Sequence, residues 1–149
     1  MEETKEDTSE LMKELDDRFR QVRRLINLEW NRDNIHGLGI THGRILMMLA
    51  EEGPQKASAM AEAMKITSGA VTGLADRLVE LGFISRERGE ADRRVVLLEI
   101  TEEGRKLISN LEEIKHSIMK RLFSGMSEQE MRNMLRYCNI MIDNFEREA

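Results

Sequence analysis

Residues 67–101 constrain the fold of this chain more than any other stretch of its sequence. Apolar residues recur there at three- and four-residue spacing over about 68–81, which predicts an amphipathic helix. Thr67 is placed to accept a hydrogen bond from an unpaired amide at the start of this helix, and Gly82 is placed to end it. The stretch therefore begins with a helix whose two ends are both marked in the sequence.

A hairpin is expected directly after this helix. Two runs rich in aliphatic residues, Phe83–Arg88 and Val95–Ile100, predict antiparallel strands joined by residues 89–94. The joining segment contains Asp92-Arg93-Arg94, which puts two guanidinium groups at or beside the hairpin tip. A helix followed by an arginine-tipped hairpin is typical of winged-helix DNA-binding proteins, because cations bind phosphates and a narrow minor groove attracts a guanidinium.

Helical patterns fill the rest of the chain. A first helix is expected over about 9–32, and a second, capped by Thr41, runs to about Glu52, where Gly53-Pro54 stops it. Further helices are expected over 55–64 and within 102–148, the last of them starting at a Ser127/Glu130 capping box. The sequence thus predicts a mainly α fold with a small β-wing.

Composition agrees with long, water-exposed helices, because 34% of the residues are charged and only 4% are aromatic. The length suits a single domain over 1–149. No apolar run approaches the roughly 20 residues of a membrane span, and the acidic N-terminus is unlike a secretory signal. We therefore expect a cytoplasmic protein with no membrane partner. The lone Cys138 rules out an internal disulfide framework.

The net charge of −5 counts against a nucleic-acid partner until its distribution is considered. Residues 1–52 hold 8 Lys or Arg against 12 Asp or Glu, whereas residues 53–106 hold 9 against 9. The segment with the helix and hairpin is therefore neutral. Four arginines still cluster within nine residues, so we expect a local basic stripe and modest non-specific affinity for DNA. They are Arg86, Arg88, Arg93 and Arg94.

DNA contacts are expected from the exposed side of the 68–81 helix and from the hairpin. A buried face of Val71, Leu74, Leu78 and Leu81 leaves small and hydroxyl side chains for DNA. Asp92 is expected to orient an arginine, either in the wing or Arg77. The alternatives are a plain helix cap for Thr67 and solvated charges for the arginines. The predicted DNA-binding residues are Thr67, Ser68, Gly69, Ala70, Thr72, Gly73, Arg77, Arg86, Arg88, Arg93 and Arg94.

The helices at the two ends of the chain carry more apolar surface than a small winged-helix core can cover. Apolar helix faces of this length are unfavourable in water. We therefore expect the helices over 9–32 and 102–148 to form a dimer interface. A two-fold dimer would place two recognition helices roughly one DNA turn apart, which suits a palindromic operator. The alternative is that these helices pack on their own domain.

The order of motifs resembles the MarR (multiple antibiotic resistance regulator) family. By motif the resemblance runs from about residue 40 to 101, and by element order it covers nearly the whole chain. It implies a homodimeric winged helix-turn-helix transcription regulator with a DNA-binding lobe over about 40–101, usually a repressor. The residues that carry it are Ile40-Thr41, Val71-Thr72, Asp76-Arg77-Leu78, Gly82-Phe83-Ile84, Asp92-Arg93-Arg94, Leu98-Glu99-Ile100-Thr101 and Glu103-Gly104.

The chain departs from the family pattern at Gly73, where many relatives carry a basic side chain. A guanidinium there could read guanine through two hydrogen bonds, worth about 1–3 kcal/mol of discrimination. Without it, sequence specificity must come from hydroxyls, backbone, DNA shape or neighbouring residues.

Many members of the family are released from DNA by a small ligand. A small aromatic or phenolic acid is the expected effector, because an aromatic ring, a cation and soft methionines suit such a molecule. Met47 and Met48 have plain core packing as their alternative role. The predicted ligand-binding residues are Trp30, His36, Thr41, Arg44, Met47 and Met48.

Other chemistry has weaker support in the sequence. Three scattered histidines predict no metal site and no cofactor, and Cys138 lies on an apolar stripe where cysteine is usually inert. No nucleophile–base pair or phosphate loop indicates an enzyme. An activating or dual-role regulator, or a winged-helix module that binds another protein, remains open as an alternative.

Overall fold

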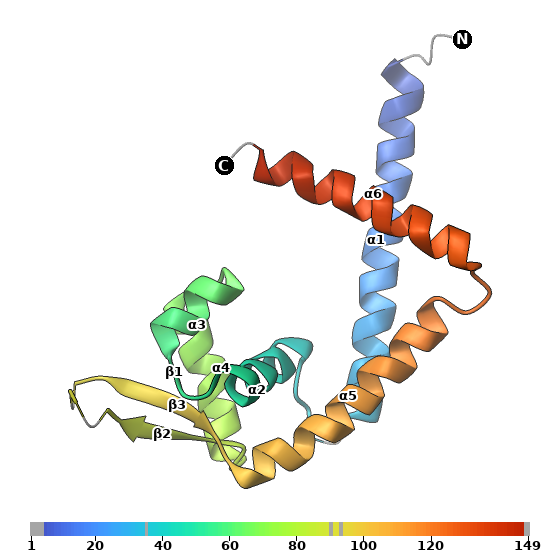
Figure 1. Ribbon diagram of the computed structural model, residues 1–149. Helices are drawn as coiled ribbons and strands as arrows, with labels where there is room; N and C mark the ends of the chain where they lie inside the picture. Colours follow the sequence, from blue (N-terminus) through green and yellow to red (C-terminus); the bar gives the residue numbers. More distant parts are fainter. Residues whose placement is uncertain (1–4, 35, 90, 93, 148–149) are drawn as a thin grey trace. The chain divides into compact units, whose positions relative to one another are not determined.

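The computed structural model describes residues 5–34, 36–89, 91–92 and 94–147. Within them the helices are α1 (Lys5–Asp33), α2 (Ile40–Glu52), α3 (Ala57–Met64), α4 (Ser68–Glu80), α5 (Glu102–Leu122) and α6 (Glu128–Glu146). The strands β1 (Gln55–Lys56), β2 (Ile84–Arg88) and β3 (Val96–Ile100) form an antiparallel sheet in the order β1-β3-β2 (Figure 1). The predicted mainly α fold with a small β-wing is confirmed.

The chain divides into two compact units, Met1–Lys115 and His116–Ala149, and each is described by itself. The first unit holds the sheet and the helices that pack on it. The second holds the end of α5 and all of α6. No helix of the described ranges combines the length and the apolarity that crossing a bilayer requires.

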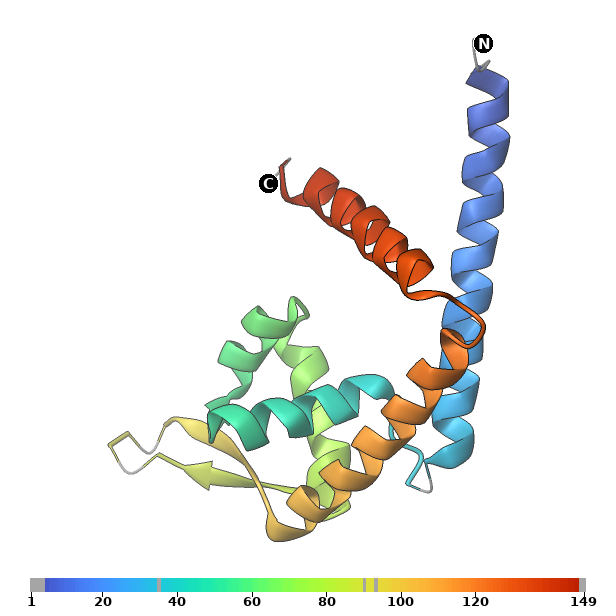
Figure 2. The ribbon, with the colours of Figure 1, turned by 45° about the vertical axis from the view of Figure 1, so that its right-hand side comes forward.

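The hairpin follows the predicted strands closely. Ile84 pairs with Ile100 and Arg88 with Val96, so β2 and β3 are in register over their whole length. The Gly89 amide donates to the Val95 carbonyl at 2.9 Å, which closes the loop end of the ladder. Both ribbon views show the hairpin extending beyond α2 and α4 of the same unit, as a wing does (Figure 2).

The helix predicted over 55–64 is wrong in its first two residues. Gln55 and Lys56 form β1 and pair with Leu98 and Leu97 of β3, and only Ala57–Met64 is helical. A two-residue strand is too short to show a period of two in the sequence. It exists because β3, some forty residues later, supplies the hydrogen-bonding partners.

The predicted cap of α2 is also wrong. The helix begins at Ile40, one residue before Thr41, and its first turn is closed by a histidine. The Nδ1 atom of His42 accepts a hydrogen bond from the Gly39 amide at 2.9 Å. This reach from the third helical position back to the residue before the helix takes the place of the threonine cap.

The core of the first unit gathers around α2 and α4. Ala75 is fully buried although the sequence did not single it out, whereas Leu74 and Leu81 are only half-buried. A small side chain at that point allows α4 to lie close to its neighbours. The side chains with no exposed surface include Ile45, Leu46, Leu49, Met60, Val71, Leu78 and Leu38.

The end of α1 is fixed to the start of α2 by buried polar groups. Trp30 is 5% exposed, and its indole N–H donates to the Leu38 carbonyl at 2.6 Å. The buried Asn34 side-chain amide donates to the same carbonyl. Because this oxygen accepts from two side chains, the short connection between the helices is held without regular secondary structure.

The junction between the sheet and α5 is equally close. The Thr101 hydroxyl donates to the Gly82 carbonyl at 2.7 Å and accepts from the Gly104 amide at 3.1 Å. A Cβ atom on Gly104 would lie 2.2 Å from the Phe83 carbonyl oxygen. Only glycine fits there, so this residue sets how closely α5 approaches the start of β2.

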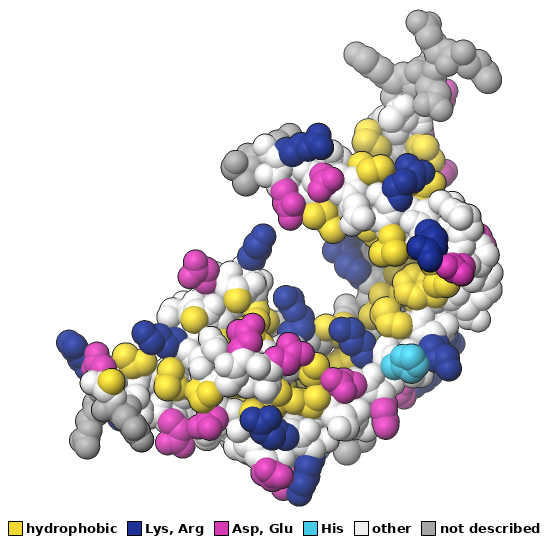
Figure 3. All heavy atoms as spheres, viewed as in Figure 1, with side chains coloured by type: hydrophobic (Ala, Val, Ile, Leu, Met, Phe, Trp, Pro, Cys, Tyr) yellow, Lys and Arg dark blue, Asp and Glu magenta, His cyan; other side chains and the backbone are white. Residues whose placement is uncertain are grey.

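The start of α6 confirms the predicted capping box. The Glu130 amide donates to the Ser127 hydroxyl at 3.1 Å, and the Ser127 amide donates to the Glu130 carboxylate at 3.0 Å. Hydrogen bonding to the Ser127 amide, and secondly to the Ser127 side chain, lowers the pKa of the Glu130 carboxyl. The helix itself buries none of its side chains, and the space-filling view shows hydrophobic groups at the surface over both α1 and α6 (Figure 3).

Candidate nucleic-acid interface

The first turns of α4 form an exposed surface of small side chains. Thr67 caps the helix in extended conformation, and its hydroxyl accepts from the Ala70 amide at 3.0 Å. The predicted contacts of this segment are brought together on the exposed side of the helix, while Val71 points into the core. They are Thr67, Ser68, Gly69, Ala70, Thr72 and Gly73.

This surface offers little steric resistance to a partner. A Cβ atom on Gly73 would meet no atom within 4 Å, and one on Gly69 would meet only the Thr67 hydroxyl at 4.0 Å. The longest exposed side chains from Thr67 to Gly73 are threonines. The backbone of α4 can therefore approach another surface closely, as a helix in a DNA groove must.

The second half of α4 is tied to the wing by an ion pair. The Arg86 guanidinium on β2 donates to the Asp76 carboxylate on α4. Arg77 lies 3.3 Å from Glu80 one turn further along. Exposed pairs of this kind are worth only about 0–1 kcal/mol, so a phosphate can compete with either carboxylate for its arginine.

Arg94 lies at the end of the hairpin with its side chain 92% exposed. The Asp92 carboxylate accepts from the Arg94 amide at 3.0 Å and from its guanidinium Nε at 3.2 Å. These hydrogen bonds, the one from the backbone amide first, lower the pKa of the Asp92 carboxyl. Asp92 was expected to orient either an arginine of the wing or Arg77, and in the structure its carboxylate contacts Arg94 of the wing.

The remaining hairpin arginines differ in how they are placed. Arg88 lies exposed at the end of β2. Arg93 lies outside the described residues. Dark blue basic side chains are visible at the end of the hairpin in Figure 3. The described part of the hairpin end therefore carries exposed arginines beside the Asp92 carboxylate.

Two features of this surface were absent from the sequence prediction. In the sequence, Asp76 is notable only as part of Asp76-Arg77-Leu78, and no helix or strand periodicity pairs it with Arg86, ten residues later. His42 was considered only among the histidines, yet its pKa is lowered, first by burial and then by the positive charge of Arg77. The Asp76–Arg86 contact and the nearness of Arg77 to His42 both depend on how α4 packs, which the local sequence does not reveal.

The residues predicted to bind an effector are in dissimilar surroundings. Trp30 belongs to the core, and Thr41, Met47 and Met48 are half-buried. His36 packs edge-on against Phe83 with ring centroids 5.0 Å apart. Arg44 is exposed. Among the described residues, no group of three or more acidic, histidine or cysteine side chains is placed to hold a metal ion.

Comparisons with known proteins agree with this geometry. Residues 38–96 match the model of the MarR family. The Bacillus subtilis protein YpoP, named as an uncharacterized HTH-type transcriptional regulator, is 29% identical over 117 residues, or 78% of this chain and 80% of its own length. The HTH-type transcriptional repressor MdtR of the same organism is 35% identical over 95 residues, which cover 62% of this chain and 61% of MdtR.

A solved structure extends the likeness over most of the chain. The crystal structure of YusO from Bacillus subtilis superposes with a TM-score of 0.69 at 26% identity, covering 91% of this chain and 94% of that one. The aligned segment of MdtR is less than two thirds of that protein, whereas YusO is matched almost throughout. The family match, the relatives and the shared winged-helix fold together show that this chain belongs to the MarR family of transcription regulators.

Proposed function

We propose that this regulator binds double-stranded DNA as a homodimer and represses transcription until a small ligand releases it. The observation that carries the proposal is the pairing of an open, small-residue face on α4 with a wing that ends in the exposed Arg94. The Arg86–Asp76 contact connects these two parts. A helix and a wing held together in this way can engage adjacent grooves of one duplex.

In the major groove, α4 approaches by its first turns. The helix start carries partial positive charge, which favours a phosphate near Thr67 and Ser68. Ser68 and Thr72 contact bases or phosphates through their hydroxyl oxygens. The absence of a side chain at Gly73 brings the backbone nearer to the base edges, and it removes the guanine contact that a basic residue would provide.

In the minor groove, Arg94 is the inserted group. Asp92 holds the guanidinium in a defined place before DNA arrives, which lowers the conformational entropy lost on binding. Arg77, Arg86 and Arg88 bind the phosphates on either side, and Arg86 keeps its contact with Asp76 while its other N–H groups face DNA. Arg93 belongs to the same predicted set.

The dimer is supported by apolar side chains that the single chain leaves in water. Leu11, Leu15 and Phe19 on α1 are about half exposed, and Leu135 and Phe145 on α6 are 63% and 82% exposed. Burial of such a side chain is worth about 1.5–3 kcal/mol. A two-fold dimer repeats each contact, and it would set two copies of α4 against a palindromic operator.

Repression and release are the regulatory part of the proposal. MdtR, one of the similar proteins, is named a repressor. An aromatic or phenolic acid bound near Trp30, His36 and Arg44 would lower DNA affinity only if it favours a dimer shape that fits DNA less well. An activator would have the same fold and differ only in where its operator lies.

Selection of duplexes from a random DNA pool with the full-length protein tests the DNA-binding proposal. We expect a palindromic motif whose half-sites lie about one helical turn apart. Recovery of no motif, together with equal weak binding to all duplexes, would contradict DNA reading and favour a protein partner. Adding aromatic acids to the complex with the selected duplex then tests release.

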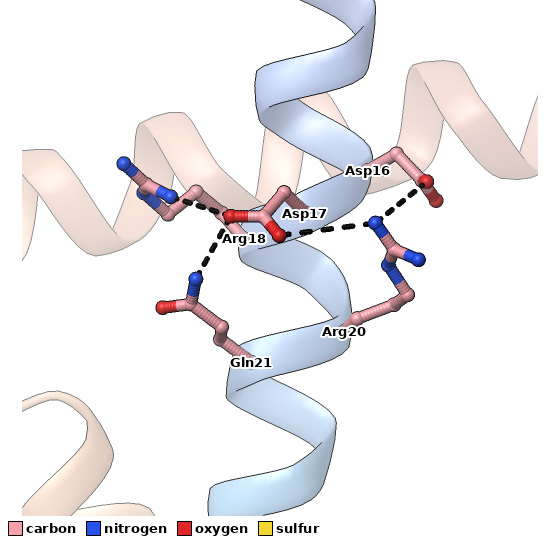
Figure 4. A network of polar contacts seen from close by, with 5 residues as sticks. All are labelled: Asp16, Asp17, Arg18, Arg20 and Gln21. Carbon is pink, nitrogen blue, oxygen red and sulfur yellow. Dashed lines mark hydrogen bonds and ion pairs between the residues drawn. The ribbon is translucent and has the colours of Figure 1, made fainter.

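An arginine variant tests the wing. Arg94→Ala should weaken binding to every duplex. The slope of log affinity against log salt concentration should become shallower by about one per subunit, because each subunit loses one cation that lies close to the DNA phosphates. Arg20→Ala is the matched control, since Arg20 lies on α1 beside Asp16 at 3.6 Å and Asp17 at 3.8 Å (Figure 4). An Arg94→Ala protein with the affinity and salt slope of the Arg20→Ala protein would show that the wing does not bind DNA.

A further inference from the structure

We infer that Thr72 determines sequence preference by reading the C5-methyl group of thymine, and that its hydroxyl acts toward the bases as an acceptor only. The inference rests on the proposed DNA-binding function, and it specifies what α4 recognises. It follows from one side-chain contact on the helix and from the chemistry of the base edges.

The hydroxyl proton of Thr72 is already used within the helix. Its Oγ1 lies 3.0 Å from the Ser68 carbonyl oxygen, one turn earlier. A carbonyl oxygen has no proton to give, so the threonine is the donor in this contact. Such back-bonding is common for threonine in helices, and it holds the hydroxyl against the preceding turn.

With its proton directed at Ser68, the exposed side chain presents a methyl group and an oxygen lone pair. The guanine edge in the major groove displays two acceptors, N7 and O6, which require a donor that Thr72 lacks. A T·A pair displays the thymine methyl and the adenine N6 amino group. These two groups complement what Thr72 offers, since methyl packs on methyl and the amino group can donate to Oγ1.

The neighbours of Thr72 leave this contact without competition. Gly73 follows it directly and Gly69 lies one turn before it, so no longer side chain projects beside it. Asp76, one turn after it, holds the Arg86 guanidinium and is not free to accept from a base. The base nearest this part of α4 is therefore read mainly through Thr72.

Uracil substitution in the duplex isolates the methyl group. In a duplex selected by the full-length protein, each thymine is replaced in turn by uracil, which removes only the C5-methyl. We expect one thymine per half-site at which the wild-type affinity falls by about fourfold, the value of one buried methyl group, and about fifteenfold when both half-sites are changed. If no thymine in the selected motif shows this loss of affinity when it is replaced by uracil, the inference is overturned.

Two variants then assign the effect to Thr72. Thr72→Ser keeps the hydroxyl and removes the methyl, so it should bind thymine and uracil duplexes equally at that position. Thr72→Val keeps the methyl in a side chain of the same shape and should retain the wild-type preference. Because the position is exposed, both proteins should melt within a few degrees of wild type, which circular dichroism checks.

The outcomes separate the inference from the function on which it rests. Specific binding with a uracil effect that persists in Thr72→Ser overturns the role of Thr72 and leaves DNA reading intact. A uracil effect that disappears in Thr72→Val would show that the hydroxyl makes the contact, which also overturns the inference. Absence of specific binding by the wild-type protein overturns both.

Discussion

The region from α2 to β3, which faces DNA in our proposal, buries its apolar residues. Helices α1 and α6 expose theirs. Leu46 and Leu78, in α2 and α4, have no exposed surface. Leu11 on α1 and Leu135 on α6 are 56% and 63% exposed. The α2–β3 region thus satisfies its hydrophobic groups within one chain. Helices α1 and α6 leave most of theirs exposed for something outside the chain, which in our account is a second copy, whereas the apolar stripe of α5 is buried.

The largest effect is expected where the end helices meet that copy. Leu135→Asp replaces an apolar contact by a charge in each of two subunits, which should weaken the dimer by about 3–6 kcal/mol. Sedimentation analysis at micromolar concentration should then show a monomer. Asn144→Asp adds the same charge on the other side of α6 and should leave the dimer intact. Equal behaviour of the two variants would remove α6 from the interface.

The second prediction tests whether the α2–α4 core is self-sufficient. Leu78→Ala, made in the monomeric Leu135→Asp protein, should lower the free energy of unfolding by about 2–5 kcal/mol, because a fully buried side chain leaves a cavity. Leu11→Ala in the same background should change it by less than about 0.5 kcal/mol. Urea unfolding measures both. A comparable loss from Leu11 would show that α1 is already packed within the single chain.

A pair of glycines sharpens the contrast within the first unit. Gly104→Ala forces a methyl against the Phe83 carbonyl, where 2.2 Å is available, and should cost about 1–3 kcal/mol or more. Gly73→Ala enters open space on a helix and should stabilise by about 0.5–1 kcal/mol. Thermal melts compare the two. Destabilisation by Gly73→Ala would mean that the face of α4 is less open than described.

The smallest effect concerns pH. The pKa of His42 is lowered from its ordinary value of 6.5, so the unfolded chain takes up this proton more readily than the folded one. The contribution of neutral His42 is therefore complete above pH 6.5 and is lost as pH falls below that value. Unfolding free energies between pH 7.5 and 5.5 should decline in the wild type and decline less in His42→Gln, whose amide oxygen can still accept from Gly39. Identical slopes would contradict this role for His42.

The fold could be predicted wherever its signals are local. The Thr67 cap and the Ser127/Glu130 capping box each involve residues three apart, and the hairpin strands are consecutive, so their patterns are visible in the sequence. Strand β1 was missed because its partner β3 is distant along the chain. The cap of α2 was misassigned because His42, a less usual capping residue, closes the turn in place of Thr41.

The sequence predicts which residues lie at the candidate site but not which of them contact one another. Which residues of α4 are exposed followed from helical periodicity, and the position of Arg94 at the wing end followed from the hairpin. The Asp76–Arg86 contact and the commitment of the Thr72 hydroxyl to Ser68 depend on side-chain geometry that no motif encodes. The predicted DNA contacts and the effector residues stay predictions that binding experiments must test.

DNA binding is best measured by fluorescence anisotropy on the DNA upstream of the protein's own gene, beside a scrambled duplex and over several salt concentrations. We expect tight binding to the native duplex, a clear preference over the scrambled one, and an affinity that falls steeply as salt rises. Equal and weak binding to both duplexes, together with failure to select any motif from a random pool, would contradict the proposed DNA binding.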